Sequence, residues 1–145
     1  MDTYIYAKVD PSEIPQVWTQ VKPLVERAMA TARGESNAEH FRRAVLNAKM
    51  DLFVAIHESK VVGAMLTQFV MHPNYTALRI CVMAGSEPHV LVTGMDEYWP
   101  RLIEWSKQHG AETWEAFCHP GMARLLQRHG FSEKYAMCVM PLKEN

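Results

Sequence analysis

The sequence lacks long apolar runs and an excess of either charge, and these absences exclude several classes of protein. Nowhere do about 18 apolar residues follow one another without a charge, so no membrane-spanning helix is expected. The start, MDTYIYAKVDP, has no basic stretch ahead of an apolar run and does not resemble a signal peptide. The 15 basic and 16 acidic residues nearly cancel, so nucleic acid, which requires a basic surface, is not an expected partner.

Cysteines are scarce and unpaired in the sequence. Cys81, Cys118 and Cys138 are odd in number, widely spaced and without a Cys-x-x-Cys motif, which argues against a disulfide framework and for a reducing compartment. Cys118 and His119 are adjacent on an expected strand and would point to opposite faces, so no metal site is predicted. The free cysteines are expected to be small core residues. We expect a cytoplasmic protein, in a host cytoplasm or a virion if a phage encodes it.

What is present is the composition of one globular domain. The chain has 145 residues, 48% of them apolar and 21% charged, with no repeat, linker or biased segment. We expect a single domain over residues 1–145.

Apolar periodicity predicts a mixed order of strands and helices. Alternating runs rich in β-formers predict strands at 4–9, 52–57, 61–71, 77–83, 113–117 and 135–140. Helical spacing predicts four helices, beginning near Asp10, Phe41, Trp99 and Pro120. The first of these has a capping box in Asp10 and Glu13, and Pro23 is expected to kink it. The order β-α-α-β-β-β-α-β-α-β predicts an α/β (α+β) fold, with a mixed central sheet and helices on both faces.

Two short motifs strengthen this interpretation. Leu125-Leu126-Gln127-Arg128-His129-Gly130-Phe131 is a short helix ending in Gly-Phe ahead of an expected late strand. Val61-Val62-Gly63-Ala64 places an apolar pair before a glycine, after a Glu-Ser-Lys turn. With the element order, these motifs resemble the GNAT acetyltransferase superfamily over nearly the whole chain. The resemblance extends to divergent GNAT-like proteins of bacteriophages.

The resemblance implies an acetyl-CoA site on the strand near residue 83 and on the loop that follows. In the family, a loop of the pattern Q/R-x-x-G-x-G/A holds the pyrophosphate on its backbone N–H groups. Here that loop is expected at 89–94, where Gly94 is the only glycine, and no Arg or Lys lies between Arg79 and Arg101. The resemblance implies that Val82 and Met83 pair with the pantetheine arm. The residues implied for what remains of the anion site are Thr93 and Gly94.

No catalytic residue is assigned by the resemblance. The family's Asn, Ala and Tyr positions ahead of Gly-Phe hold His119, Met122 and Leu126, and leucine cannot donate a proton to the leaving thiolate. Substitute acids are Tyr75, Tyr98, Tyr135 and Cys118. Candidate bases are Glu87, His89 and Glu115, each with an alternative as an ordinary loop or solvent-facing strand residue.

Two functions of different class are therefore kept open. The first is an acyl-CoA-dependent N-acyltransferase with a non-standard pyrophosphate loop, acting on a small-molecule or protein amine. The second is a catalytically inactive GNAT-fold interaction or structural protein, such as a phage virion-associated component, with a protein partner or a homo-oligomeric state. An exposed Trp99 or Trp105 beside Tyr98 would favour an interface.

Overall fold

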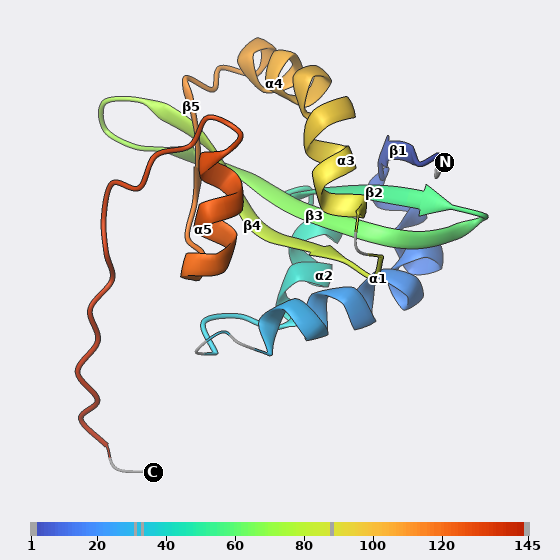
Figure 1. Cartoon of the computed structure of the whole chain (residues 1–145). Coiled ribbons are helices and arrows are strands. Elements are labelled where there is room, and N and C mark those ends of the chain that lie inside the picture. The colour runs from blue at the N-terminus through green and yellow to red at the C-terminus, as the bar shows by residue number, and fades with distance from the viewer. Residues whose placement is uncertain (1–2, 31, 33, 88, 144–145) are drawn as a thin grey trace.

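A five-stranded sheet organises the computed structural model, which describes residues 3–30, 32, 34–87 and 89–143 (Figure 1). The strands follow the chain order β1 (Ile5–Lys8), β2 (Asp51–His57), β3 (Lys60–Met71), β4 (Thr76–Gly85) and β5 (Thr113–Ala116). The first four are antiparallel neighbours, and β5 is parallel to β4. The predicted mixed sheet is confirmed.

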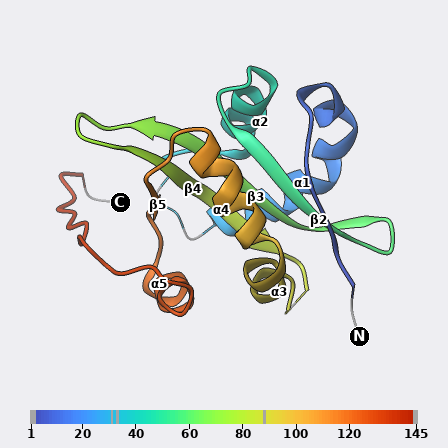
Figure 2. The same ribbon diagram turned by 90° about the horizontal axis from the view of Figure 1, so that it is seen from above.

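Helices cover both faces of the sheet (Figures 1 and 2). They are the 3-10 helix η1 (Pro11–Glu13) and the α-helices α1 (Ile14–Met29), α2 (Ala38–Leu46), α3 (Val90–Glu97), α4 (Trp99–Gln108) and α5 (Pro120–Gln127). Helices α1 and α2 pack on one face around Leu66, which is fully buried. Helices α3, α4 and α5 pack on the other face with Met65, the preceding residue on β3. Successive side chains of β3 therefore contribute to two hydrophobic cores, one on each face of the sheet.

The local helix signals in the sequence are confirmed at the first helix. The Asp10 carboxylate accepts a hydrogen bond from the Ser12 N–H at 2.9 Å, and Glu13 Oε1 accepts one from the Asp10 N–H at 3.2 Å. These two bonds form the expected capping box. Pro23 lies within a continuous α1, and Asn37 caps α2 by accepting the His40 N–H at 2.9 Å.

Two predicted features of the second half are wrong. Residues 135–140 form no strand. A strand needs a neighbouring strand for its backbone hydrogen bonds, and this segment pairs with none within the described chain. Trp99 is 6% exposed and Trp105 is partly buried against Phe53 and Phe69, so neither side chain is an exposed anchor beside Tyr98.

The cysteines also differ from the expected core residues. Cys81 is half-buried, whereas Cys118 and Cys138 are exposed, because both follow the end of β5 where less of the chain packs around them. Among the described residues, no helix combines the length and apolar character needed to cross a bilayer.

Candidate functional site

The strands β4 and β5 separate halfway along β4. Their parallel pairing runs only from Ala77 opposite Thr113 to Ile80 opposite Ala116. Strand β4 continues to Gly85, so its edge over residues 81–85 has no strand partner on the β5 side within the described chain. Unpaired backbone N–H and C=O groups on such an edge are available to an extended ligand.

A β-bulge at Cys81 marks the point of separation. Leu66 lies opposite Val82, but the next residue, Thr67, lies opposite Ile80, so Cys81 is an extra residue in β4. A bulge bends its strand and increases the local twist. The bend thus coincides with the position where β5 leaves β4.

The predicted cofactor residues Val82 and Met83 lie on this unpartnered edge. The Val82 side chain is 5% exposed and packs in the core beneath α1 and α2, whereas Met83 packs on the opposite face, against the core under α3 and α4. Both side chains are therefore committed to packing. Only their backbone groups are available to a ligand lying between β4 and β5.

The residues expected to form the pyrophosphate loop, 89–94, are helical from Val90 onward. Residues 90–97 form α3, so the connection after β4 is confined to the few residues between Gly85 and Val90. Thr93 lies inside the helix, where its N–H donates to the His89 carbonyl at 2.9 Å. Gly94 faces the ring of Tyr6, with an added Cβ 3.4 Å from Tyr6 Cε1. Neither residue lies at the helix N-terminus.

Packing explains why the helix starts so early. Val90 is 2% exposed and lies over Gly63 of β3 and Gly85 of β4, where its two methyl groups fill the space that a Cβ would occupy. The bulky residue that departs from the family's loop pattern is therefore the anchor of α3. His89 at the N-cap places no side-chain acceptor on the first-turn N–H groups.

Glu87 is held beside this connection by Tyr4, which directly precedes β1, and by His57 of β2. Its carboxylate accepts a hydrogen bond from the Tyr4 hydroxyl at 3.1 Å and lies 3.1 Å from His57 Nδ1. The hydrogen bond from His57 is the main cause of a lowered pKa for Glu87, and Tyr4 contributes against the opposing effect of burial. Glu87 is thus an anchored carboxylate rather than a free loop acid.

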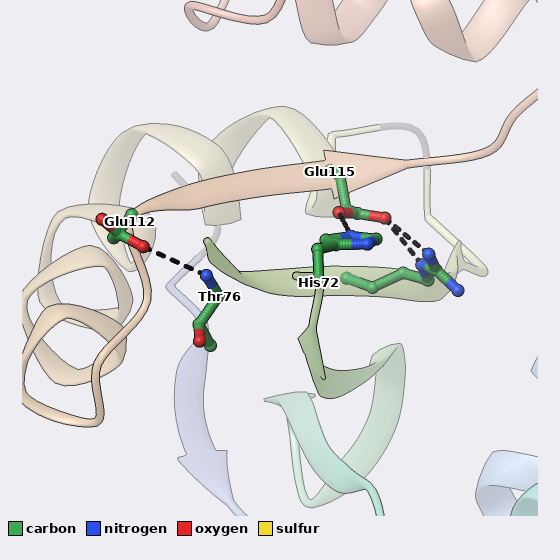
Figure 3. A network of polar contacts seen from close by, with 5 residues as sticks. His72, Thr76, Glu112 and Glu115 are labelled. Atoms are coloured by element: carbon green, nitrogen blue, oxygen red, sulfur yellow. Dashed lines mark hydrogen bonds and ion pairs between the residues drawn. The ribbon is translucent and has the colours of Figure 1, made fainter. Parts of the chain in front are cut away.

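Glu115 lies at the other end of the open edge, one residue before the strands part (Figure 3). Arg79 donates to its Oε2 from Nε at 2.9 Å and from Nη2 at 2.7 Å, and His72 Nε2 lies 2.7 Å from Oε1. The Glu115 side chain is 23% exposed, so the prediction of an ordinary solvent-facing carboxylate is wrong. Burial raises its pKa, but the hydrogen bonds from His72 and Arg79 outweigh burial and lower the pKa below its ordinary value.

The start of β5 is tied to β4 by a further contact in the same figure. The Thr76 N–H donates to the Glu112 carboxylate at 3.1 Å, just ahead of the first paired residues (Figure 3). The Arg79 guanidinium also lies 5.0 Å from the centre of the Phe117 ring. These contacts hold the Arg79–Glu115 pair against the sheet.

The residues at the family's Asn, Ala and Tyr positions have structural roles in the described chain. His119 Nδ1 accepts the Met122 N–H at 3.2 Å and caps α5. Leu126 is 3% exposed in the core beneath α4. Met122 packs partly buried against the same core. The sequence motif is therefore explained by the packing and capping of α5.

The substitute acids lie in different places. Tyr98 stacks on Tyr6 at 5.1 Å between ring centres, Tyr75 lies beside His72, and Tyr135 is 89% exposed in the C-terminal segment. Cys118 lies two residues beyond the end of β5, where burial and the charge of Glu133 raise the pKa of its thiol. Of these four groups, Cys118 is nearest in the chain to the separation of β4 and β5.

The histidine, cysteine and acidic side chains are dispersed over the described part of the chain. No group of three histidine, cysteine or acidic side chains is arranged there to hold a metal ion. Close in the chain to the ends of β4 and β5 lie the paired carboxylates of Glu87 and Glu115 and the thiols of Cys81 and Cys118.

Comparisons with known proteins identify the fold but no close relative. No family model and no curated protein matches the sequence. Among solved structures, an aminoglycoside acetyltransferase from an uncultured soil metagenomic sample, in complex with sisomicin, superposes with a TM-score of 0.71 at 15% identity, over 97% of both chains. A predicted acetyltransferase with acetyl-CoA from Clostridium acetobutylicum gives a TM-score of 0.67 at 14% identity, again over 97% of both chains.

A third similar structure is the ribosomal-protein-alanine N-acetyltransferase from Brucella melitensis biovar Abortus 2308. Its TM-score is 0.70 at 10% identity, over 97% of this chain and all of the other. The agreement covers the sheet and the helices on both of its faces. This chain therefore has the fold of the GNAT acetyltransferases.

Proposed function

We propose that this protein is an acyl-CoA-dependent N-acyltransferase that binds its cofactor between β4 and β5. The observation that carries the proposal is the unpartnered edge of β4 over residues 81–85, which begins at the Cys81 bulge. A pantetheine arm is extended and contains two amide groups, so it can hydrogen-bond this edge as a short strand would. Val82 and Met83 would contribute their backbone N–H and C=O groups.

The pyrophosphate would lie at the first turn of α3. Its N–H groups receive no side-chain cap from His89, and a helix N-terminus attracts anions through these groups and the helix dipole. Thr93 and Gly94 lie one turn further along and would act through the helix rather than by direct contact. No glycine-rich cradle is needed if the phosphates remain at the helix end.

The two anchored carboxylates lie at opposite ends of the proposed cofactor path. Glu87 follows the end of β4 and would lie near the phosphates, whereas Glu115 lies where the path begins, beside the Cys81 bulge. The thioester would then lie at the Glu115 end, about 15 Å from the helix N-terminus over five strand residues. Glu115 is therefore the proposed base for the acceptor amine, and Glu87 is not.

Cys118 is the proposed acid. A thiol whose pKa is raised remains protonated near neutral pH and can donate a proton to the leaving thiolate of CoA. The acceptor would be a small-molecule or protein amine approaching the Glu115 side of the sheet. The similar structure with acetyl-CoA supports the proposed cofactor, and the similar structure with sisomicin supports an amine acceptor. We propose that the reaction takes place in the cytoplasm.

The first experiment is titration calorimetry with acetyl-CoA and CoA, followed by turnover assays with an amine panel. We expect micromolar binding by the wild type and by Glu115→Gln, with turnover by Glu115→Gln lowered by about 10²- to 10⁴-fold. Glu112→Gln is the matched control, because Glu112 precedes β5 and its carboxylate accepts a hydrogen bond from the Thr76 backbone rather than from His72 or Arg79. No binding at millimolar acetyl-CoA would refute the proposal.

A second function is favoured by one specific observation. Val90 occupies the space above Gly63 and Gly85, so the connection to α3 serves packing in place of a glycine-rich cradle. This is what a GNAT fold retained without catalysis would have, in an interaction or structural protein such as a phage virion component. The turnover assays distinguish the two functions, because only the acyltransferase transfers an acyl group to an amine.

A further inference from the structure

The C-terminal segment carries an unusual share of the exposed apolar surface. Residues 132–143 are all exposed and lie in no helix or strand. Among the described residues, five of the eleven large exposed hydrophobic side chains lie in this segment: Tyr135, Met137, Val139, Met140 and Leu142. A contiguous apolar stretch left in water indicates a site of contact with another surface.

The sequence of this segment is that of a β-strand. Residues 135–140 read Tyr-Ala-Met-Cys-Val-Met, without charge, glycine or proline. In Figure 1 the chain beyond α5 leads away from the sheet. The Phe131 ring packs against the Trp99 ring, with 6.0 Å between the ring centres. This ring contact holds the chain against the domain at Phe131, and the strand-forming stretch lies beyond it.

The same chain also presents an unpaired strand edge. Strand β5 is last in the sheet order and pairs only with β4, so its outer edge is unpartnered within the described chain. Natural proteins cover such edges or pair them with another strand. Phe117, directly after β5, is 70% exposed and extends the apolar character of this edge.

We propose that two copies of this chain exchange their C-terminal segments, each placing residues 135–140 beside β5 of the other. Every copy carries both the donor strand and the acceptor edge, so two reciprocal contacts close a symmetric dimer. A six-residue strand spans about 20 Å, enough to cover all four residues of β5 and the start of the following loop. A dimer of this kind buries the exposed hydrophobic side chains without a foreign partner.

The exchange has a consequence for the candidate site. Glu115 lies on β5, so the added strand would run about 4.8 Å from its backbone and form a wall of the site from the second copy. The proposal does not depend on acyl transfer. Its failure appears as a change in assembly, whereas failure of the proposed function appears as a lack of acetyl-CoA binding.

The first test is the mass in solution by light scattering coupled to gel filtration. We expect a dimer for the full chain and a monomer for Met137→Pro, because proline in the middle of the exchanged strand removes an N–H donor and blocks pairing. Leu142→Pro, outside residues 135–140, is the matched control and should remain dimeric. A monomeric wild type, or a dimer that withstands Met137→Pro, would overturn the proposal.

The second test separates exchange from pairing within one chain. Cys118 and Cys138 are both exposed and lie next to β5 and within the segment, so each can carry one end of a bismaleimide linker. Two variants are made in a Cys81→Ser background: one keeps only Cys118, the other keeps only Cys138, and their tags differ in length. The two variants are mixed to allow subunit exchange. A cross-linked product containing both tags supports exchange. Cross-linking only within single chains that keep both cysteines overturns it.

Discussion

The side chain of Val90 lies directly over Gly85, so closely that a methyl group on Gly85 would overlap the Val90 Cγ1. The other Val90 methyl lies 3.0 Å from the position of a Cβ on Gly63. One valine therefore fixes the start of α3 on two neighbouring strands. This contact sets where β4 ends and where the proposed anion site begins.

We expect Gly85→Ala to destabilise the protein by about 1–3 kcal/mol, because the new methyl group forces Val90 away from its packed position. Urea denaturation followed by circular dichroism measures the change. Gly85→Ala should cost less stability in a Val90→Ala background than in the wild type, since the overlapping methyl groups are then absent. An equal cost in both backgrounds would contradict the proposed overlap.

Gly94→Ala is the matched control for this prediction. Its added Cβ would lie 3.4 Å from the Tyr6 ring, an ordinary contact, and alanine is favoured over glycine inside a helix. We expect no loss of stability from this change. A large loss would mean that α3 is closer to β1 than the structure places it.

Local signals in the sequence predicted much of the fold. The capping box of Asp10 and Glu13 forms as expected, and Gly110 ends its helix with a φ of +94°. His109 Nδ1 lies 2.8 Å from the Trp105 carbonyl at that helix end. Each of these features depends on residues within a few positions of one another, so a single sequence contains the information.

The site was less predictable because its contacts join distant parts of the chain. The pairs that hold Glu115 and Glu87 join residues 30 to 83 positions apart in the sequence. Which side chains meet there depends on strand register and on the Cys81 bulge, and neither has a local signal. The helical conformation from Val90 onward was not predicted for the same reason, since the packing of Val90 on Gly63 is a long-range contact.

Thr67 provides a second test of packing. Its side chain is fully buried, and its hydroxyl has no hydrogen-bond partner among the described residues. We expect Thr67→Val, which keeps the shape and removes the unpaired hydroxyl, to stabilise the protein by about 1 kcal/mol. Thermal unfolding measures the gain, with Thr113→Val at an exposed position of β5 as the control. A loss of stability would mean that the hydroxyl has a partner.

The Glu115 pairs predict a dependence of stability on pH. Because the pKa of Glu115 is lowered in the folded state, its ionised form stabilises the fold above the ordinary value of 4.5. That contribution is lost as the pH falls through the lower folded-state pKa. We expect the melting temperature of the wild type to drop more steeply below pH 4.5 than that of Glu115→Gln. Parallel curves would contradict the pairing with Arg79 and His72.

Glu87 predicts a change in cofactor affinity. Its carboxylate lies just before α3, near the proposed position of the phosphates, and a negative charge there opposes their binding. We expect Glu87→Gln to tighten acetyl-CoA binding by about two- to fivefold at low salt, with a smaller gain at high salt because ions screen the repulsion. Titration calorimetry at two ionic strengths measures both effects.

Glu104→Gln is the control for this charge change, because Glu104 lies on α4 and pairs with Lys107 at the surface. It removes the same unit of charge from the protein at a position on α4 that is already paired with a lysine. Equal tightening by both variants would mean that net charge alone governs binding. Unchanged binding by Glu87→Gln would place the phosphates away from α3, and weaker binding would contradict repulsion between this carboxylate and the phosphates.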